Sequence, residues 1–269
     1  RHSFPTRRSS DLIAILNADD GEIVTRANRF TDRKVFFSLE TPAPGEIGVV
    51  ENLLVDRAFV ADPQQASMIC ELADIKPTVP HNVSNALAAA ALARSIDISH
   101  EVIQSALQEF RPGRHRIETV YESDSISWVD DSKATNPHAA AASLMSHLSV
   151  VWIAGGLAKG ADMATVVQRC KARIKAAVLI GADRQLIADA LTKYAPEIPQ
   201  IIVDAPSDYT RGGQSNGLME AVVKAAQGFA SAGDTVLMAP ACASMDLFIS
   251  YADRGDRFAA AVKKLVANE

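Results

Sequence analysis

The stretch Val150 to Gly160, VVWIAGGLAKG, shows the fold class most clearly. Its first five residues form a short apolar run typical of a strand buried on both faces, and the glycines allow a tight turn before a helix. Strands that alternate with helices predict βαβ units, right-handed crossovers and a mainly parallel sheet. Residues 112–269 are therefore expected to form one Rossmann-like α/β domain. Further strands are expected at Ser125–Val129, Ala177–Ile180, Gln200–Val203 and Thr235–Met238.

The preceding half, residues 13–111, has a different rhythm. Short apolar runs broken by turns predict a strand-rich region up to about Ala61, including a hairpin within IGVVENLLVDRAFV. Helices are expected at Pro63–Leu72, Asn82–Arg94 and Glu101–Phe110, and the pattern favours Asn82 as a simple N-cap. Arg111-Pro112-Gly113 separates this α/β region from the next one.

Composition restricts the class of protein. A hydrophobic content of 48% with 22% charged residues indicates a globular chain, and a net charge of −5 argues against nucleic acid as a partner. The three cysteines show no metal-binding spacing, so a reducing compartment, the cytoplasm, is expected. No apolar run approaches the roughly 20 residues that span a bilayer. Residues 1–12, RHSFPTRRSSDL, are expected to be a leader foreign to the fold.

Three polar loops follow strands of the expected parallel sheet. They are DDSKATN (Asp130–Asn136), GGLAKG (Gly155–Gly160) and PACAS (Pro240–Ser244). Ligands of such sheets bind beyond the carboxyl ends of the strands, so the three loops are expected to open on the same side. Lysines and hydroxyls there suit an anion. An ordinary N-cap turn explains the first loop equally well, and a simple glycine turn explains the second loop better than a functional role does.

Two further residues leave both a functional and an ordinary interpretation open. Cys242 has the appearance of a nucleophile, but a lone cysteine among Ala and Pro is more often a small buried hydrophobe. Arg116 follows the junction between the halves, where a guanidinium would clamp phosphate or form a surface ion pair.

Taken together, several motifs resemble the Mur ligase family, and DSKATN with PACAS resembles its D-glutamate-adding members. The others are NADD (17–20), HNxxN (81–85), GRHRIE (113–118), GGLAKGAD (155–162), APACASMDLF (239–248) and RGDRF (254–258). The resemblance implies ATP-driven ligation of D-glutamate to UDP-N-acetylmuramoyl-L-alanine through an acyl phosphate, with Mg²⁺, by a monomeric enzyme of peptidoglycan synthesis. It also implies that residues 13–111 are the C-terminal part of a central ATP-binding domain and residues 112–269 the C-terminal domain.

The resemblance assigns roles to individual residues. The nucleotide side is expected to include Asn82, Asn85, Arg116, Asp131 and Lys133, of which the last three are the catalytic candidates. D-glutamate is expected to contact Thr135, Lys159, Ser244, Met245 and Tyr251, with Tyr251 standing where the family often has Phe. No metal ligand is expected in this chain, because the family's phosphate loop and magnesium ligands lie upstream of residue 1. The chain alone is therefore expected to be inactive.

Other interpretations remain open at this stage. Another amide ligase of the same superfamily, such as one that extends folate with glutamate, is disfavoured by DSKATN and PACAS. A nucleotide- or dinucleotide-binding module is disfavoured because no strand is followed by G-x-G-x-x-G. A non-catalytic folding or interaction fragment is the third alternative.

Overall fold

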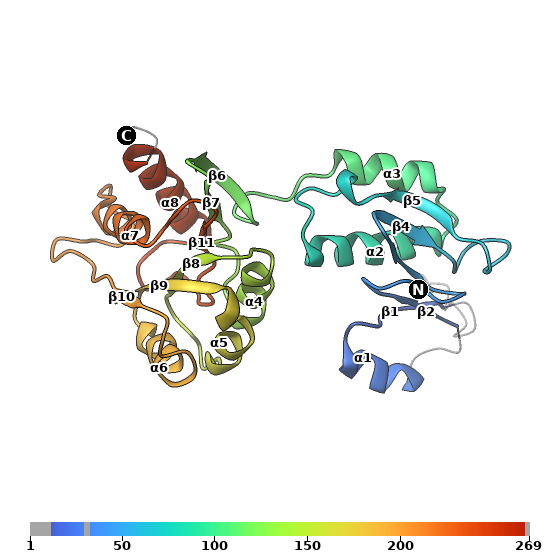
Figure 1. The fold of residues 1–269 in the computed structure, drawn as a ribbon, viewed down its shortest axis with the longest axis horizontal. Helices are drawn as coiled ribbons and strands as arrows, with labels where there is room; N and C mark the ends of the chain where they lie inside the picture. Colours follow the sequence, from blue (N-terminus) through green and yellow to red (C-terminus); the bar gives the residue numbers. More distant parts are fainter. Residues whose placement is uncertain (1–11, 30–32, 267–269) are drawn as a thin grey trace, which may run out of the picture. The chain divides into compact units, whose positions relative to one another are not determined.

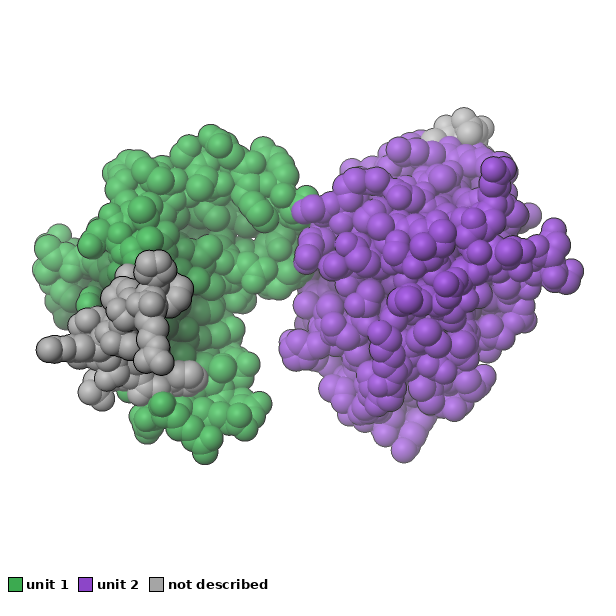
Figure 2. Space-filling model, turned by 180° about the vertical axis from the view of Figure 1, so that it is seen from behind, with its two compact units in different colours: residues 1–112 green, residues 113–269 purple. Residues whose placement is uncertain are grey.

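The computed structural model describes residues 12–29 and 33–266. The chain divides between Pro112 and Gly113 into an N-terminal and a C-terminal compact unit, which Figure 2 shows in different colours. The expected boundary lay one residue earlier. Residues 1–11 of the expected leader lie outside the described residues.

The N-terminal unit contains a five-stranded sheet in the order β1-β2-β3-β4-β5. Strands β1, β2 and β3 are parallel to one another, whereas β4 pairs antiparallel with both β3 and β5. The expected hairpin is formed by β3 and β4. The strands are β1 (Ala14–Asn17), β2 (Lys34–Phe37), β3 (Ile47–Val50), β4 (Leu53–Asp56) and β5 (Ser67–Glu71); the helices are α1 (Gly21–Arg26), α2 (Pro80–Arg94) and α3 (His100–Glu109), with short 3-10 turns at Ala27–Arg29 and Leu72–Asp74.

Two expectations for this unit are wrong. The helix expected at 63–72 is instead a turn followed by strand β5, because Ile69 and Cys70 are buried and the strand pairs with β4. Tertiary pairing here overrides the local helix propensity. Asn82 is not the N-cap of α2: that position is Val79, and Pro80 opens the helix, where its missing N–H costs nothing.

The C-terminal unit contains a six-stranded sheet in the order β10-β9-β8-β11-β7-β6. All neighbours are parallel except β6 and β7. The strands are β6 (Glu118–Ser123), β7 (Ile126–Asp130), β8 (Val150–Gly155), β9 (Ile174–Ile180), β10 (Gln200–Ile202) and β11 (Thr235–Met238); the helices are α4 (Pro137–Met145), α5 (Ala164–Cys170), α6 (Arg184–Tyr194), α7 (Gly217–Gln227) and α8 (Tyr251–Leu265), with a 3-10 turn at Lys171–Arg173.

Helices cover both faces of this sheet, with α4 to α6 on one side and α7 and α8 on the other (Figure 1). Every residue of β8 and β11 is buried, as near-continuous apolar strands of a covered parallel sheet should be. Because β11 returns to lie between β7 and β8, the chain reverses its direction of winding there, and such switch points open a crevice at the carboxyl edge. Within residues 12–29 and 33–266, no helix has both the length and the apolar character needed to cross a bilayer.

Strand β6 was not expected from the sequence. It forms a hairpin with β7 through Asp124 and Ser125, whose φ angles are 50° and 60°. Positive φ at both central residues is the geometry of a type I′ turn, which usually carries Asn-Gly rather than Asp-Ser. The sequence therefore lacks the usual hairpin signal at this turn.

Candidate functional site at the carboxyl edge of the C-terminal sheet

Backbone hydrogen bonds join the three polar loops into one frame. Leu157 and Ala243 exchange N–H to C=O bonds of 2.8 and 2.9 Å, which links the loop after β8 to the loop after β11. The Ala241 N–H donates to the Ala134 carbonyl at 3.0 Å, linking the loop after β11 to the loop after β7. These bonds join residues that are 86 and 107 positions apart in the sequence.

Glycines allow these loops to touch. A Cβ on Gly156, whose φ is +133°, would lie 2.2 Å from the Ala243 carbonyl oxygen. A Cβ on Gly181, in the loop after β9, would lie 2.5 Å from the Gly156 backbone. No side chain larger than hydrogen fits at such distances, so both positions require glycine for space and for conformation.

Arg254 of α8 forms hydrogen bonds to all three loops, and its side chain is fully buried. Its guanidinium donates to the Ser132 hydroxyl at 2.8 Å and to the Ser132 carbonyl at 3.0 Å. It also donates to the carbonyls of Cys242 at 3.3 Å and Gly155 at 3.4 Å. Burial lowers the pKa of Arg254 to about 10, which still leaves the group charged at neutral pH. Arg254 lies within the RGDRF motif, but the sequence pattern alone indicated no role for it.

The candidate nucleotide-side residues of this unit lie on two segments. Asp131 is 8% exposed, and burial raises the pKa of its carboxyl to about 7, with the neighbouring Asp130 acting in the same direction. The Lys133 ammonium lies 3.8 Å from the centre of the Tyr251 ring, a cation–π contact. This contact brings a residue expected at the nucleotide next to one expected at D-glutamate.

Arg116 is exposed because of the backbone around it. His115 and Ile117 have φ angles of 65° and 49°, and both side chains are buried. One residue with left-handed backbone thus lies on each side of Arg116, a conformation that is rare outside glycine, asparagine and aspartate. This backbone turns the Arg116 side chain toward solvent. Strain of this kind is concentrated at functional sites.

The candidate D-glutamate residues divide by exposure. Ser244 is 3% exposed, whereas Met245 is 54% exposed. Lys159 is exposed and has a φ of +52°, and Thr135 is half-buried just before Asn136, which caps α4. The loops at this edge of the sheet therefore carry an exposed ammonium and both partly and fully buried hydroxyls, a combination that suits a carboxylate ligand.

Asn82 and Asn85 belong to the N-terminal unit. The Asn82 amide donates to the Pro77 carbonyl at 3.1 Å, and Asn85 is exposed on the next turn of α2. The two side chains therefore differ: one already has a partner within its unit, and the other faces solvent.

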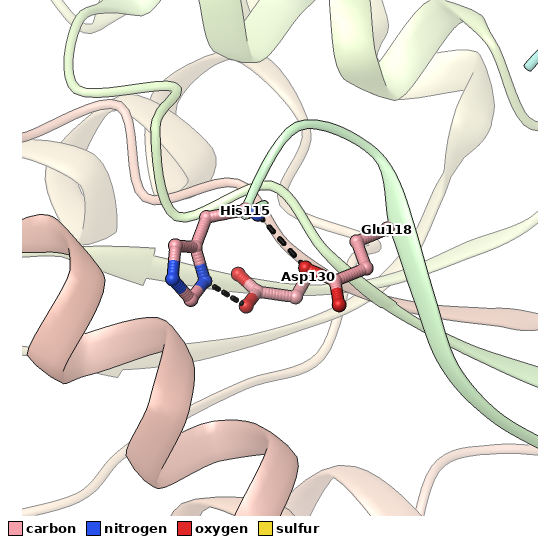
Figure 3. Close-up of side chains that lie close together, drawn as sticks. All are labelled: His115, Glu118 and Asp130. Carbon is pink, nitrogen blue, oxygen red and sulfur yellow. Dashed lines mark hydrogen bonds and ion pairs between the residues drawn. The ribbon is translucent and has the colours of Figure 1, made fainter. Parts of the chain in front are cut away.

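Among the described residues, one group of potential metal ligands stands out: His115, Glu118 and Asp130 (Figure 3). Magnesium, which the resemblance implies, prefers octahedral oxygen ligands. This group contains an imidazole, and its members are already hydrogen-bonded to one another. It does not fit magnesium.

The burial of Cys242 argues against a role as a nucleophile. Burial raises the pKa of its thiol to about 12, so the reactive thiolate is scarce at neutral pH. Its side chain fills space between the loops, and its carbonyl accepts from Arg254.

Residues 115–242 match the family described as Mur ligase, glutamate ligase domain. That segment covers most of the C-terminal unit, including the loops after β7 and β8. This match shows that residues 115–242 belong to the Mur ligase family.

Two curated relatives of the chain share one name. The chain is similar to the UDP-N-acetylmuramoylalanine--D-glutamate ligase of Streptomyces avermitilis, with 51% identity over 99% of this chain and 53% of the relative. It is 49% identical to the ligase of the same name from Thermobifida fusca, over 94% of this chain and 54% of the relative. The chain thus spans about half the length of these curated relatives.

Solved structures agree on the fold. A pseudomurein peptide ligase type C from Methanothermus fervidus superposes with a TM-score of 0.61 at 16% identity, covering 93% of this chain and 56% of that one. UDP-N-acetylmuramate-alanine ligase MurC from Thermotoga maritima gives 0.55 at 16% identity, over 92% of this chain and 55% of that one. At such identity the likeness shows the α/β architecture alone.

Proposed function

We propose that this chain belongs to an ATP-dependent ligase that joins D-glutamate to UDP-N-acetylmuramoyl-L-alanine, and that its C-terminal unit provides the D-glutamate pocket. The observation that carries the proposal is the single frame formed by the three loops, which places an exposed Lys159, the buried Ser244 and Thr135 at one edge. The names of the relatives supply the substrates.

The reaction requires two steps. The substrate carboxylate attacks the γ-phosphorus of ATP, which forms an acyl phosphate and releases ADP; the amine of D-glutamate then attacks the acyl carbon, which forms the amide and releases phosphate. Lys159 would pair with a D-glutamate carboxylate, and the Ser244 and Thr135 hydroxyls would fix its orientation. Arg116 and Lys133 would neutralise phosphate charge on the nucleotide side. Magnesium ligands would come from outside the described residues.

Calorimetric titration of the chain with D-glutamate tests the proposal. Separate titrations with L-glutamate and D-aspartate measure its specificity. D-glutamate should bind more tightly than either, and Lys159→Ala should weaken it about tenfold or more because a charge-assisted contact is lost. Lys224→Ala on α7 is a matched control, since Lys224 is also exposed but lies on a different element. Equal binding of both glutamate enantiomers, or equal effects of the two lysine variants, would contradict the proposal.

A further inference from the structure

The buried side chain of His115 connects the two segments that carry the candidate nucleotide cations. The residue is 4% exposed, and its Nδ1 atom lies 2.7 Å from Oδ2 of the fully buried Asp130 (Figure 3). Gly255 packs directly against the pair: a Cβ there would lie 2.3 Å from Nδ1 and 2.5 Å from Oδ2. The pair is therefore enclosed on the side of α8 and has little freedom to move.

Backbone groups of His115 and of the neighbouring segments form further hydrogen bonds around this pair. The His115 carbonyl accepts from the Lys133 N–H at 3.1 Å, and the His115 N–H donates to the Glu118 carboxylate at 2.9 Å. The other oxygen of Asp130 accepts from the Ser132 N–H at 2.9 Å. Each bond joins either the segment around Arg116 or the segment around Lys133 to the His115–Asp130 pair.

We propose that His115 is a positioning residue: its hydrogen bond to Asp130 holds the Arg116 segment and the Lys133 segment in register for the nucleotide. This inference rests on the proposed function, because the nucleotide is the ligand of that function. The left-handed backbone of His115 supports it, since a non-glycine residue is strained there and persists only where surrounding bonds enforce the conformation.

A resident metal is the main competing explanation for the same cluster. The short Nδ1–Oδ2 distance and the packing of Gly255 leave no space for an ion on the α8 side. Both oxygens of Asp130 already accept hydrogen bonds. A general stabilising role is the other competitor, and it predicts equal losses throughout the unit rather than at the two segments.

Two substitutions of His115 separate these explanations. Asn places an amide nitrogen as many bonds from Cα as Nδ1, whereas Gln places it one bond further away. His115→Asn should therefore keep the bond to Asp130, and His115→Gln should lose it. Asn also tolerates a left-handed backbone better than Gln, so both substitutions are repeated with Asp130→Ala. Any advantage of Asn that depends on the bond must disappear in that background.

Hydrogen exchange and nucleotide binding give the readouts. In His115→Gln the amides of Lys133 and Ser132 should exchange about tenfold faster, with the amides of β8 unchanged; His115→Asn should stay close to the parent. Calorimetry with ADP should show about tenfold weaker binding for Gln than for Asn, with D-glutamate affinity equal in both.

Three results would overturn the inference: equal effects of Asn and Gln, faster exchange throughout the sheet, or stoichiometric Zn²⁺ binding lost with His115. If the parent chain binds no ADP, the nucleotide half of the proposed function fails. The exchange pattern then still shows whether the pair holds the two segments.

Discussion

The two units hold their candidate nucleotide residues in different ways. In the N-terminal unit, Asn82 and Asn85 project from consecutive turns of one helix, and the Asn82 side chain donates a hydrogen bond to a nearby carbonyl. In the C-terminal unit, Lys133 belongs to a loop fixed by backbone bonds to two other segments and by the buried Arg254. A helix presents side chains by its own geometry, whereas loops need support from residues far away in the sequence.

This contrast has a consequence for mutation. In the N-terminal unit, replacing a candidate residue should change ligand contacts and little else. In the C-terminal unit, the residues that keep the loops in place are not those that face the ligand. Damage to the site should therefore come most strongly from residues beneath it, such as Arg254 and Gly156.

Arg254→Ala should produce the largest effect. It leaves the carbonyls of Ser132, Cys242 and Gly155 without their buried donor, and each buried acceptor left unsatisfied costs about 1–3 kcal/mol. Urea unfolding followed by tryptophan fluorescence reports on this unit alone, because the chain's two tryptophans are Trp128 and Trp152. The exposed Arg169→Ala on α5 is the control. Equal stability of the two variants would show that the loops do not depend on Arg254.

Asp131→Asn should stabilise the C-terminal unit in a pH-dependent way. Burial raises the pKa of the folded carboxyl to about 7, so its favourable contribution is complete below about pH 4 and is lost as pH rises through 7. The stability difference between the Asp131→Asn variant and the parent should therefore grow from pH 4 to pH 7 and then level off, with an upper limit of about 4 kcal/mol.

Unfolding curves at several pH values measure this difference, with Asp208→Asn at an exposed position as the control. A difference that stays constant across this pH range, or one that shrinks as pH rises, would contradict a raised pKa at Asp131.

Gly156→Ala and Gly160→Ala separate close contact from backbone conformation. Both glycines have positive φ, but a Cβ on Gly156 meets the Ala243 carbonyl at 2.2 Å, whereas one on Gly160 meets nothing within 4 Å. Gly160→Ala should cost about 1 kcal/mol for conformation, and Gly156→Ala should cost about 1–3 kcal/mol more because the loops must separate. The same fluorescence assay compares them. Equal costs would mean that the loops are free to move apart.

Tyr251 should give the smallest effect. The Lys133 ammonium lies over its ring in a cation–π contact, and such a contact contributes about 0.5–2 kcal/mol. Tyr251→Phe should leave stability and ADP affinity nearly unchanged, and Tyr251→Leu should alter ADP affinity about threefold by freeing Lys133. An equal effect of Phe and Leu would assign the role to the hydroxyl instead of the ring.

The parallel core of the C-terminal unit was predictable because β8, β9 and β11 are short apolar runs bounded by glycine or aspartate. The three loops followed from the strands, since parallel strands end at one edge. Strand β6 and the Asp124-Ser125 turn were missed because the turn lacks the usual glycine. Strand β5 was missed because Pro63 and its neighbours favour a helix locally while Ser67–Glu71 pairs with β4.

The supporting residues of the site could not be predicted from local pattern. Arg254, His115 and Asp130 acquire their roles through partners up to 122 residues away, and no spacing rule connects them. Gly181 likewise looks like an ordinary turn glycine until the Gly156 backbone is seen against it. Long-range contacts of this kind appear only in the folded chain.

The most direct test of the central claim is an NMR titration of the chain with D-glutamate, which locates the ligand even when binding is weak. We predict that shifts concentrate at the amides of residues 133–136, 156–160 and 241–246, and that L-glutamate produces smaller ones. Shifts confined to other regions, such as the shallow hollow between α5 and α6 lined by Asp162 and Lys193, would contradict the account.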